Sequence, residues 1–182
     1  MGLIWILAAT VWGVAEATFF FIVPDVLLTA AVIKFGFRRT LPLAFVTAAT
    51  ASLAGLGMWL WANSDAAAAR DAMLQVPAIG PDLLARAHDE IANNWIVHLF
   101  TGALTGLPYK LYAVEAGAQG INPILFTLIS VPARLLRFVL AMGLAAVLRE
   151  ALSKIGRPQW NYPVWAFAWI ALYAVYFTLR AA

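Results

Sequence analysis

The sequence contains no cysteine and only two histidines, which excludes several kinds of site. Without cysteine the chain has no disulfide, no thiolate metal ligand and no cysteine nucleophile. Two histidines alone do not supply the ligands of a typical zinc site, so we predict no bound metal. Charged residues are also scarce, at 12% of the chain. The nine arginines and three lysines form no polybasic run, so we predict no nucleic-acid partner.

Hydrophobic residues instead make up 64% of the 182 residues, compared with about 45 to 50% in an ordinary soluble domain. The chain has four long uncharged runs, at residues 1–15, 41–62, 116–133 and 159–179. A soluble body of 19.7 kDa is too small to hide all of them from water. The composition therefore predicts a membrane protein, and it argues against a soluble enzyme or a disordered tail.

The first 40 residues contain an apolar run whose length does not suit a simple transmembrane helix. Residues 3–33 are uncharged apart from Glu16 and Asp25. This stretch is too long for one spanning helix of about 20 residues and too short for two. Pro24 has no amide hydrogen to donate, so it is expected to break a helix here. We predict a re-entrant hairpin over 1–40, whose broken backbone must be buried in protein or line a wet cavity.

A second break is expected later in the chain. Gly102, Gly106 and Pro108 interrupt an apolar stretch, so residues 95–120 are predicted to form a second re-entrant hairpin. The predicted transmembrane helices cover residues 41–62, 121–148 and 159–179, and the aromatic-rich last one is expected to face lipid. Residues 63–94 are predicted to form an aqueous connector.

Part of this connector has helical periodicity. Its apolar side chains recur at spacings near 3.6, at Leu83, Leu84, Ala87 and Ile91. The spacing indicates a short amphipathic helix lying on the membrane surface, and a solvated connector is the alternative interpretation.

The distribution of charge predicts the orientation. The loops at 34–39 and 149–158 are basic and should be cytoplasmic, whereas the acidic connector should be outside. Each half then consists of a hairpin and a span, in opposite orientations, which is the inverted-repeat layout of many transporters. The predicted fold class is all-α, a single polytopic membrane domain over 1–182 with two opposed re-entrant hairpins and three to four full spans.

Four charges are expected near the middle of the membrane. Arg134 lies about 18 Å along its span, close to the centre of a hydrocarbon core about 30 Å thick. Arg137 shares its face, and Glu16 and Asp25 are the expected counter-charges. One interpretation is a wet cavity in which the arginines bind an anionic head group and an acid takes up a proton. The other is a buried ionic clasp between the two halves.

Other polar residues are weaker candidates. Lys110 and Tyr109 follow the break of the second hairpin, where they could meet phosphate, although Lys110 could equally extend to the membrane interface. Glu115 is close enough in sequence to pair with Lys110 and is expected to have a structural role. His98 is expected to be a hydrogen-bonded helix residue, and His88 a surface residue.

Three motifs together resemble a known family. They are EATFFFIVPD from Glu16 to Asp25, LPYK from Leu107 to Lys110, and PARLLRF from Pro132 to Phe138. In this order they resemble the DedA superfamily, also called VTT or SNARE-associated proteins, and most of all its short YqaA-type branch. The resemblance covers about residues 10–148.

The resemblance implies two opposed re-entrant hairpins, broken at Pro24 and Pro108, and a role in lipid translocation. Bacterial members are linked to movement of undecaprenyl phosphate or phospholipid across the inner membrane, and eukaryotic relatives to scrambling. Glu16, Asp25 and the two arginines match the family's charged positions. Asp25 follows the proline directly, as in the YqaA branch, whereas larger members usually have a glutamate two residues after the proline.

We therefore predict a flippase-like or scramblase-like transporter of a phosphate-bearing lipid, in a bacterial inner membrane. It would need no cofactor, although a proton gradient could drive it. The alternatives are a proton-coupled transporter of small solutes or ions, and a non-catalytic membrane scaffold. An enzyme is disfavoured because neither histidine lies in a catalytic motif. The oligomeric state is left open, a homo-oligomer included.

Overall fold

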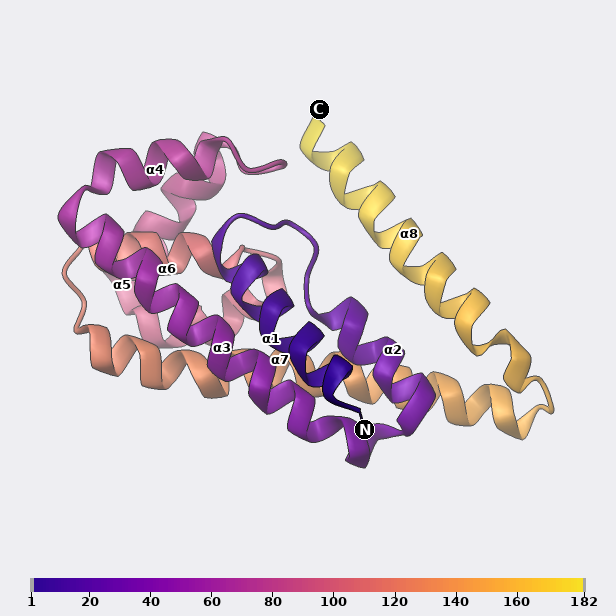
Figure 1. The fold of residues 1–182 in the computed structure, drawn as a ribbon. Helices are drawn as coiled ribbons and strands as arrows, with labels where there is room; N and C mark the ends of the chain where they lie inside the picture. Colours follow the sequence, from indigo (N-terminus) through magenta and orange to yellow (C-terminus); the bar gives the residue numbers. More distant parts are fainter. Residues whose placement is uncertain (1, 182) are drawn as a thin grey trace.

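The computed structural model describes residues 2–181, and over this range the chain forms helices without any strand. The predicted all-α class is therefore confirmed. Residues 1 and 182, the ends of the predicted domain, lie outside the described residues. The helices are α1 (Leu3–Thr18), α2 (Asp25–Phe35), α3 (Phe37–Ser64), α4 (Ala66–Leu74), α5 (Pro81–Thr105), α6 (Tyr109–Ala118), α7 (Pro123–Lys154) and α8 (Asn161–Ala181) (Figure 1).

Two of the described helices, α3 and α7, are long and apolar enough to cross a membrane, judged by length and composition. They contain most of the predicted spans at 41–62 and 121–148. Pro123 and an Asn122 side chain that accepts the Leu125 amide hydrogen at 3.0 Å fix the start of α7. The predicted third span, at 159–179, corresponds to α8 and is not among these two helices.

The first hairpin consists of α1 and α2, which run in opposite directions (Figure 1). The helices are separated by residues 19–24, and Pro24 directly precedes α2, so the chain breaks where the sequence predicts. Within this turn, the Trp12 indole donates a hydrogen bond to the Ile22 carbonyl at 2.9 Å. Gly36, at a φ of 86°, then allows the sharp return into α3.

The second break lies between α5 and α6. Gly106 adopts a left-handed φ of 84°, and Pro108 directly precedes α6. Helix α5 begins at Pro81, so it crosses the boundary predicted between the connector and the second hairpin. The boundary is marked by Asn94, whose backbone is not helical and whose side chain accepts the Val97 amide hydrogen at 3.3 Å.

The apolar face of the connector packs inside the protein. Leu83, Ala87 and Ile91 are buried in one core cluster with Met73 of α4 and Val76. This differs from the predicted helix on a membrane surface. The reason is that α5 packs against α6, so its apolar face is covered by protein.

Helix α8 crosses one side of the bundle and stands away from the other helices over much of its length (Figure 1). The central helix α3, by contrast, packs closely through small residues. A Cβ atom added at Gly55 would lie 2.6 Å from the Tyr109 ring, so this glycine permits the contact between α3 and α6. The space left between α8 and the bundle contains the candidate site.

Candidate functional site

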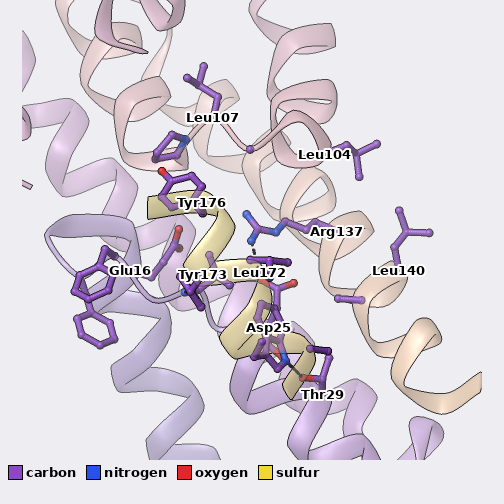
Figure 2. A pocket seen from close by; sticks show the side chains of 18 of the residues that line it. Glu16, Asp25, Thr29, Leu104, Leu107, Arg137, Leu140, Leu172, Tyr173 and Tyr176 are labelled. Atoms are coloured by element: carbon purple, nitrogen blue, oxygen red, sulfur yellow. Dashed lines mark hydrogen bonds and ion pairs between the residues drawn. The ribbon is translucent and has the colours of Figure 1, made fainter. Parts of the chain in front are cut away.

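A cavity of about 600 Å³ lies between α1, α2, the break between α5 and α6, α7 and α8 (Figure 2). Its wall is mostly apolar, with a small number of charged and hydrogen-bonding side chains. The polar residues that line it include Glu16, Asp25, Thr29, Lys110, Arg137 and Tyr173. Four of the predicted site residues therefore share one cavity, although α1, α2, α6 and α7 supply them.

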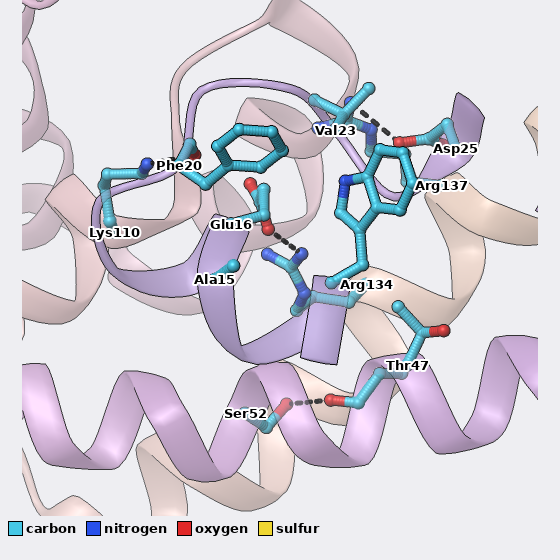
Figure 3. Close-up of polar contacts among 12 residues, drawn as sticks. Ala15, Glu16, Phe20, Val23, Asp25, Thr47, Ser52, Lys110, Arg134 and Arg137 are labelled. Carbon is cyan, nitrogen blue, oxygen red and sulfur yellow. Dashed lines mark hydrogen bonds and ion pairs between the residues drawn. The ribbon is translucent and has the colours of Figure 1, made fainter. Parts of the chain in front are cut away.

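The structure pairs each predicted midplane arginine with one of the predicted acids (Figure 3). Arg134 and Glu16 form a buried ion pair that connects α7 to α1. The Arg134 guanidinium also lies 4.4 Å from the Tyr109 ring centroid, in a cation–π contact. Arg134 and Tyr109 border a separate void of about 20 Å³ and do not line the main cavity. Their geometry favours a role in holding the cavity wall.

The second pair lies directly on the cavity. Arg137 Nη2 is 3.0 Å from Asp25 Oδ2, and both residues line the wall. The Arg137 side chain is 25% exposed, whereas Asp25 is buried. Neither carboxylate oxygen of Asp25 accepts a hydrogen bond from the described residues. Asp25 therefore has acceptor positions that a ligand or a proton could use.

Lys110 connects α6 to the turn between α1 and α2. Its side chain is buried, and its Nζ donates a hydrogen bond to the Phe20 carbonyl at 2.7 Å. An ammonium group has three protons to donate, so this contact leaves donors for an anion in the cavity. Phe20 belongs to the turn of the first hairpin, so one side chain fixes the distance between the two breaks.

Glu115 does not pair with Lys110, although the two are close in sequence. The two residues are five positions apart on α6, which places their side chains on different faces of the helix. Glu115 instead accepts two hydrogen bonds from Arg70, from Nε at 2.7 Å and from Nη2 at 2.6 Å. His88 Nδ1 lies 2.9 Å from the same carboxylate. The His88 side chain is half exposed, as predicted for a surface residue, but it also contacts the buried Glu115. The cluster attaches α4 and α5 to α6, away from the cavity.

The Glu115 cluster predicts a pH dependence of stability. Burial by itself would raise the pKa of Glu115, but the hydrogen bonds from Arg70 and His88 outweigh it and lower the pKa below its ordinary value of 4.5. A lowered folded-state pKa stabilises the fold above pH 4.5, and this contribution is lost as the pH falls through the folded value. Thermal unfolding of the purified protein should therefore show that the wild type loses stability between pH 7 and pH 3. The Glu115→Gln variant should lack the part of this loss that comes from Glu115.

A matched control for this experiment is Glu150→Gln. Glu150 pairs with Lys154 at 2.8 Å on an exposed surface, where an ion pair contributes little. We expect this variant to keep the pH dependence of the wild type. A Glu115→Gln variant that loses stability on acidification as steeply as the wild type would contradict the assignment.

Two tryptophans of α8 are attached to the first hairpin. The indole nitrogens of Trp165 and Trp169 donate hydrogen bonds to Thr29 Oγ1, at 2.9 and 3.1 Å. Thr29 in turn donates its proton to the Asp25 carbonyl at 2.6 Å. The Thr29 hydroxyl therefore uses its donor and both acceptor positions. Thr29 lies one helical turn after Asp25, the acid that lines the cavity.

Tyr173 makes a similar contact. Its hydroxyl accepts the Val23 amide hydrogen at 2.8 Å, in the turn of the first hairpin. The prediction that the 159–179 segment faces lipid is therefore wrong for this face of α8. The sequence analysis missed Trp165, Trp169 and Tyr173 as functional residues. Their pattern could have indicated a shared contact, because they lie four residues apart on one helix face and each aromatic ring carries a polar atom.

Thr29→Val should loosen α8. Valine has nearly the same shape, but it leaves two partly buried indole N–H groups without an acceptor. The expected loss is about 2 kcal/mol of unfolding free energy. Thr178→Val is the control, because the Thr178 hydroxyl is exposed and, among the described residues, bonds to the Ala174 carbonyl of its own helix. Chemical denaturation monitored by tryptophan fluorescence measures both variants, and equal stability would contradict the proposed attachment.

In comparisons with known proteins, the chain matches no protein-family model, no curated protein and no solved structure. The resemblance to the DedA superfamily therefore stays a prediction. The chemistry of the cavity is defined by its own residues: two cations, two carboxylates and a large apolar wall. Such a cavity suits a ligand that has both a charged group and a hydrocarbon part.

Proposed function

We propose that this chain is an integral membrane protein that moves a phosphate-bearing lipid from one side of a membrane to the other. The observation that carries the proposal is the composition of one cavity. Arg137 and Lys110 lie at the same cavity as a long row of leucines and aromatic residues. A lipid phosphate presents the complementary pair of groups, an anionic head and an apolar chain.

The exposed surface supports insertion in a membrane. Large apolar side chains are exposed along α3, α7 and α8, for example Leu53, Ile124 and Phe167, which is 74% exposed. A soluble protein rarely presents so many of them to water. The hydrocarbon core of a membrane would cover these side chains and keep them out of water.

The basic residues support one orientation. The turn after α2 and the end of α7 lie side by side, since a Cβ atom at Gly36 would be 3.1 Å from Arg149 Nη1. Arg38 and Lys154 belong to the same two segments. Basic residues gathered at one end favour a cytoplasmic location for that end, in a bacterial inner membrane.

The charged end of the cavity suggests how a head group would be held. Arg137 can form two parallel hydrogen bonds to phosphate, and Lys110 can contribute a third donor. Phosphate would then compete with Asp25 for Arg137. Head-group binding would therefore separate the ion pair between Arg137 and Asp25.

The test is lipid movement in liposomes that contain the purified protein, with fluorescent phospholipid and polyprenyl phosphate as probes. Arg137→Gln should abolish the movement, and combining it with Asp25→Asn avoids leaving a buried carboxylate without its cation. Arg149→Gln is the control, as it removes an exposed arginine that does not line the cavity. Wild-type movement by Arg137→Gln would overturn the proposed site.

A further inference from the structure

The cavity extends beyond its charged end as an apolar groove between α7 and α8. One wall is the face of α7 that follows Arg137, and the other is the facing side of α8. The residues that form it are Leu140, Leu144 and Leu148 on α7, and Trp165, Ala168 and Leu172 on α8. The three leucines are four positions apart, so they form one row along the helix.

The length of the groove corresponds to one leaflet. Arg137 and Leu148 are separated by about 16 Å along α7, at 1.5 Å per residue. The hydrocarbon core of a bilayer is about 30 Å thick, so one leaflet contributes about half of that. A chain of a membrane lipid therefore fits along the row with its head beside Arg137.

The groove is open at its side. Leu144 is 75% exposed and Leu172 is 53% exposed, although both line the cavity. A hydrocarbon chain could therefore enter between α7 and α8 from the surrounding lipid. The charged end lies at the same cavity (Figure 2), which favours a lipid chain over a peptide or a second copy of this protein.

The direction of the groove fixes the orientation of its occupant. The end formed by Leu148 and Trp165 lies next to the turn that joins α7 to α8, which carries the basic residues Lys154 and Arg157. On the other side of Arg137 the cavity is bordered by Leu107 and Tyr176 (Figure 2).

We infer that the groove between α7 and α8 is a binding site for one hydrocarbon chain, which points from Arg137 toward the basic end of the molecule. This inference rests on the proposed function. It means that the bound lipid has the orientation of the leaflet opposite to the basic end. The structure then represents the state that receives a lipid from, or releases it to, that leaflet.

Photo-crosslinking in nanodiscs tests the site with two probes, both hexadecyl phosphates that carry a diazirine. One probe has the diazirine at the chain end, and the other has it next to the phosphate. The chain-end probe should label residues 144–148 and 165–168, and the head-end probe should label residues 104–110 and 137–141. Labelling in the reverse order, or labelling that excess unlabelled hexadecyl phosphate does not reduce, would overturn the inference.

A pair of tryptophan variants adds a control for lipid that merely surrounds the protein. Leu144→Trp fills the groove, whereas Val147→Trp places the same ring on an exposed position of α7 that does not line the cavity. We expect Leu144→Trp to reduce the labelling at 165–168 that unlabelled hexadecyl phosphate can compete away. The expected reduction is about tenfold, because a filled groove would leave about two methylene groups of the bound chain unburied. Equal labelling in the two variants would contradict the site.

Transport by the wild type separates the two proposals. If lipid moves in an Arg137-dependent manner but the labels fall outside the groove, the chain site is wrong and the proposed function stands. If the labels follow the expected order but no lipid moves, the site stands and the transport function is wrong.

Discussion

Replacing Arg134 with alanine should lower the stability of the protein by about 3 to 5 kcal/mol, the usual effect of removing one partner of a buried ion pair. The variant leaves the Glu16 carboxylate buried without its cation. It also removes the guanidinium that packs against the Tyr109 and Phe138 rings. The pair links α1 to α7, whereas α2 packs against α7 independently, so the loss should loosen α1 and leave α2 in place. Thermal unfolding of the purified protein measures the effect.

A double variant distinguishes a transport site from a structural clasp. Replacing Glu16 with glutamine and Arg134 with methionine removes both charges and keeps most of the volume. Apolar replacement of a buried pair often preserves stability, so the double variant should be nearly as stable as the wild type. Because the Glu16 carboxylate lines the cavity, we expect the double variant to move no lipid. Wild-type movement by this variant would identify the pair as a clasp.

Gly117→Ala should have an effect of similar size, through backbone contact. A Cβ atom at Gly117 would lie 2.9 Å from the Trp59 carbonyl carbon. A backbone atom cannot move away by changing rotamer, so α3 and α6 would have to separate. We expect a loss of about 3 kcal/mol, at the upper end of the usual range for overpacking.

Gly143→Ala is the matched control for this substitution. Gly143 lies in α7, and a Cβ atom there would meet nothing within 4 Å. Alanine favours a helix more than glycine does, so this variant should gain about 0.5 to 1 kcal/mol. Denaturant unfolding of the two variants measures the difference. A Gly117→Ala protein as stable as the wild type would show that α3 and α6 are not in close contact.

The features that the sequence predicts well are those with a local cause. Proline lacks an amide hydrogen, and the breaks beside Pro24 and Pro108 could be located because the length of the first apolar run and the glycines before Pro108 also indicated them. Proline alone is not sufficient, since Pro132 lies inside α7 without ending the helix. Isolated charges in such runs need partners, which led from Arg134 and Arg137 to Glu16 and Asp25. The structure brings both pairs together.

The features that the sequence does not predict depend on residues that are far apart in the chain. Glu115 pairs with Arg70, 45 positions earlier, because α4 lies against α6. Lys110 is closer in sequence, but its side chain contacts the Phe20 carbonyl instead. The role of α8 was missed for the same reason, since its aromatic face has meaning only once Thr29 of α2 lies against it. Arg134 and Arg137 share a helix face, but only Arg137 reaches the main cavity.

The most direct test of the central claim is to follow two substrates in the same liposomes. The wild-type protein is reconstituted across a pH gradient with a fluorescent phospholipid and polyprenyl phosphate in the membrane and inorganic phosphate trapped inside. We predict that lipid changes leaflet faster than in protein-free liposomes while the trapped phosphate is retained. Release of phosphate without lipid movement would identify a small-solute transporter, and no movement of either would favour a scaffold. Both results would contradict lipid transport.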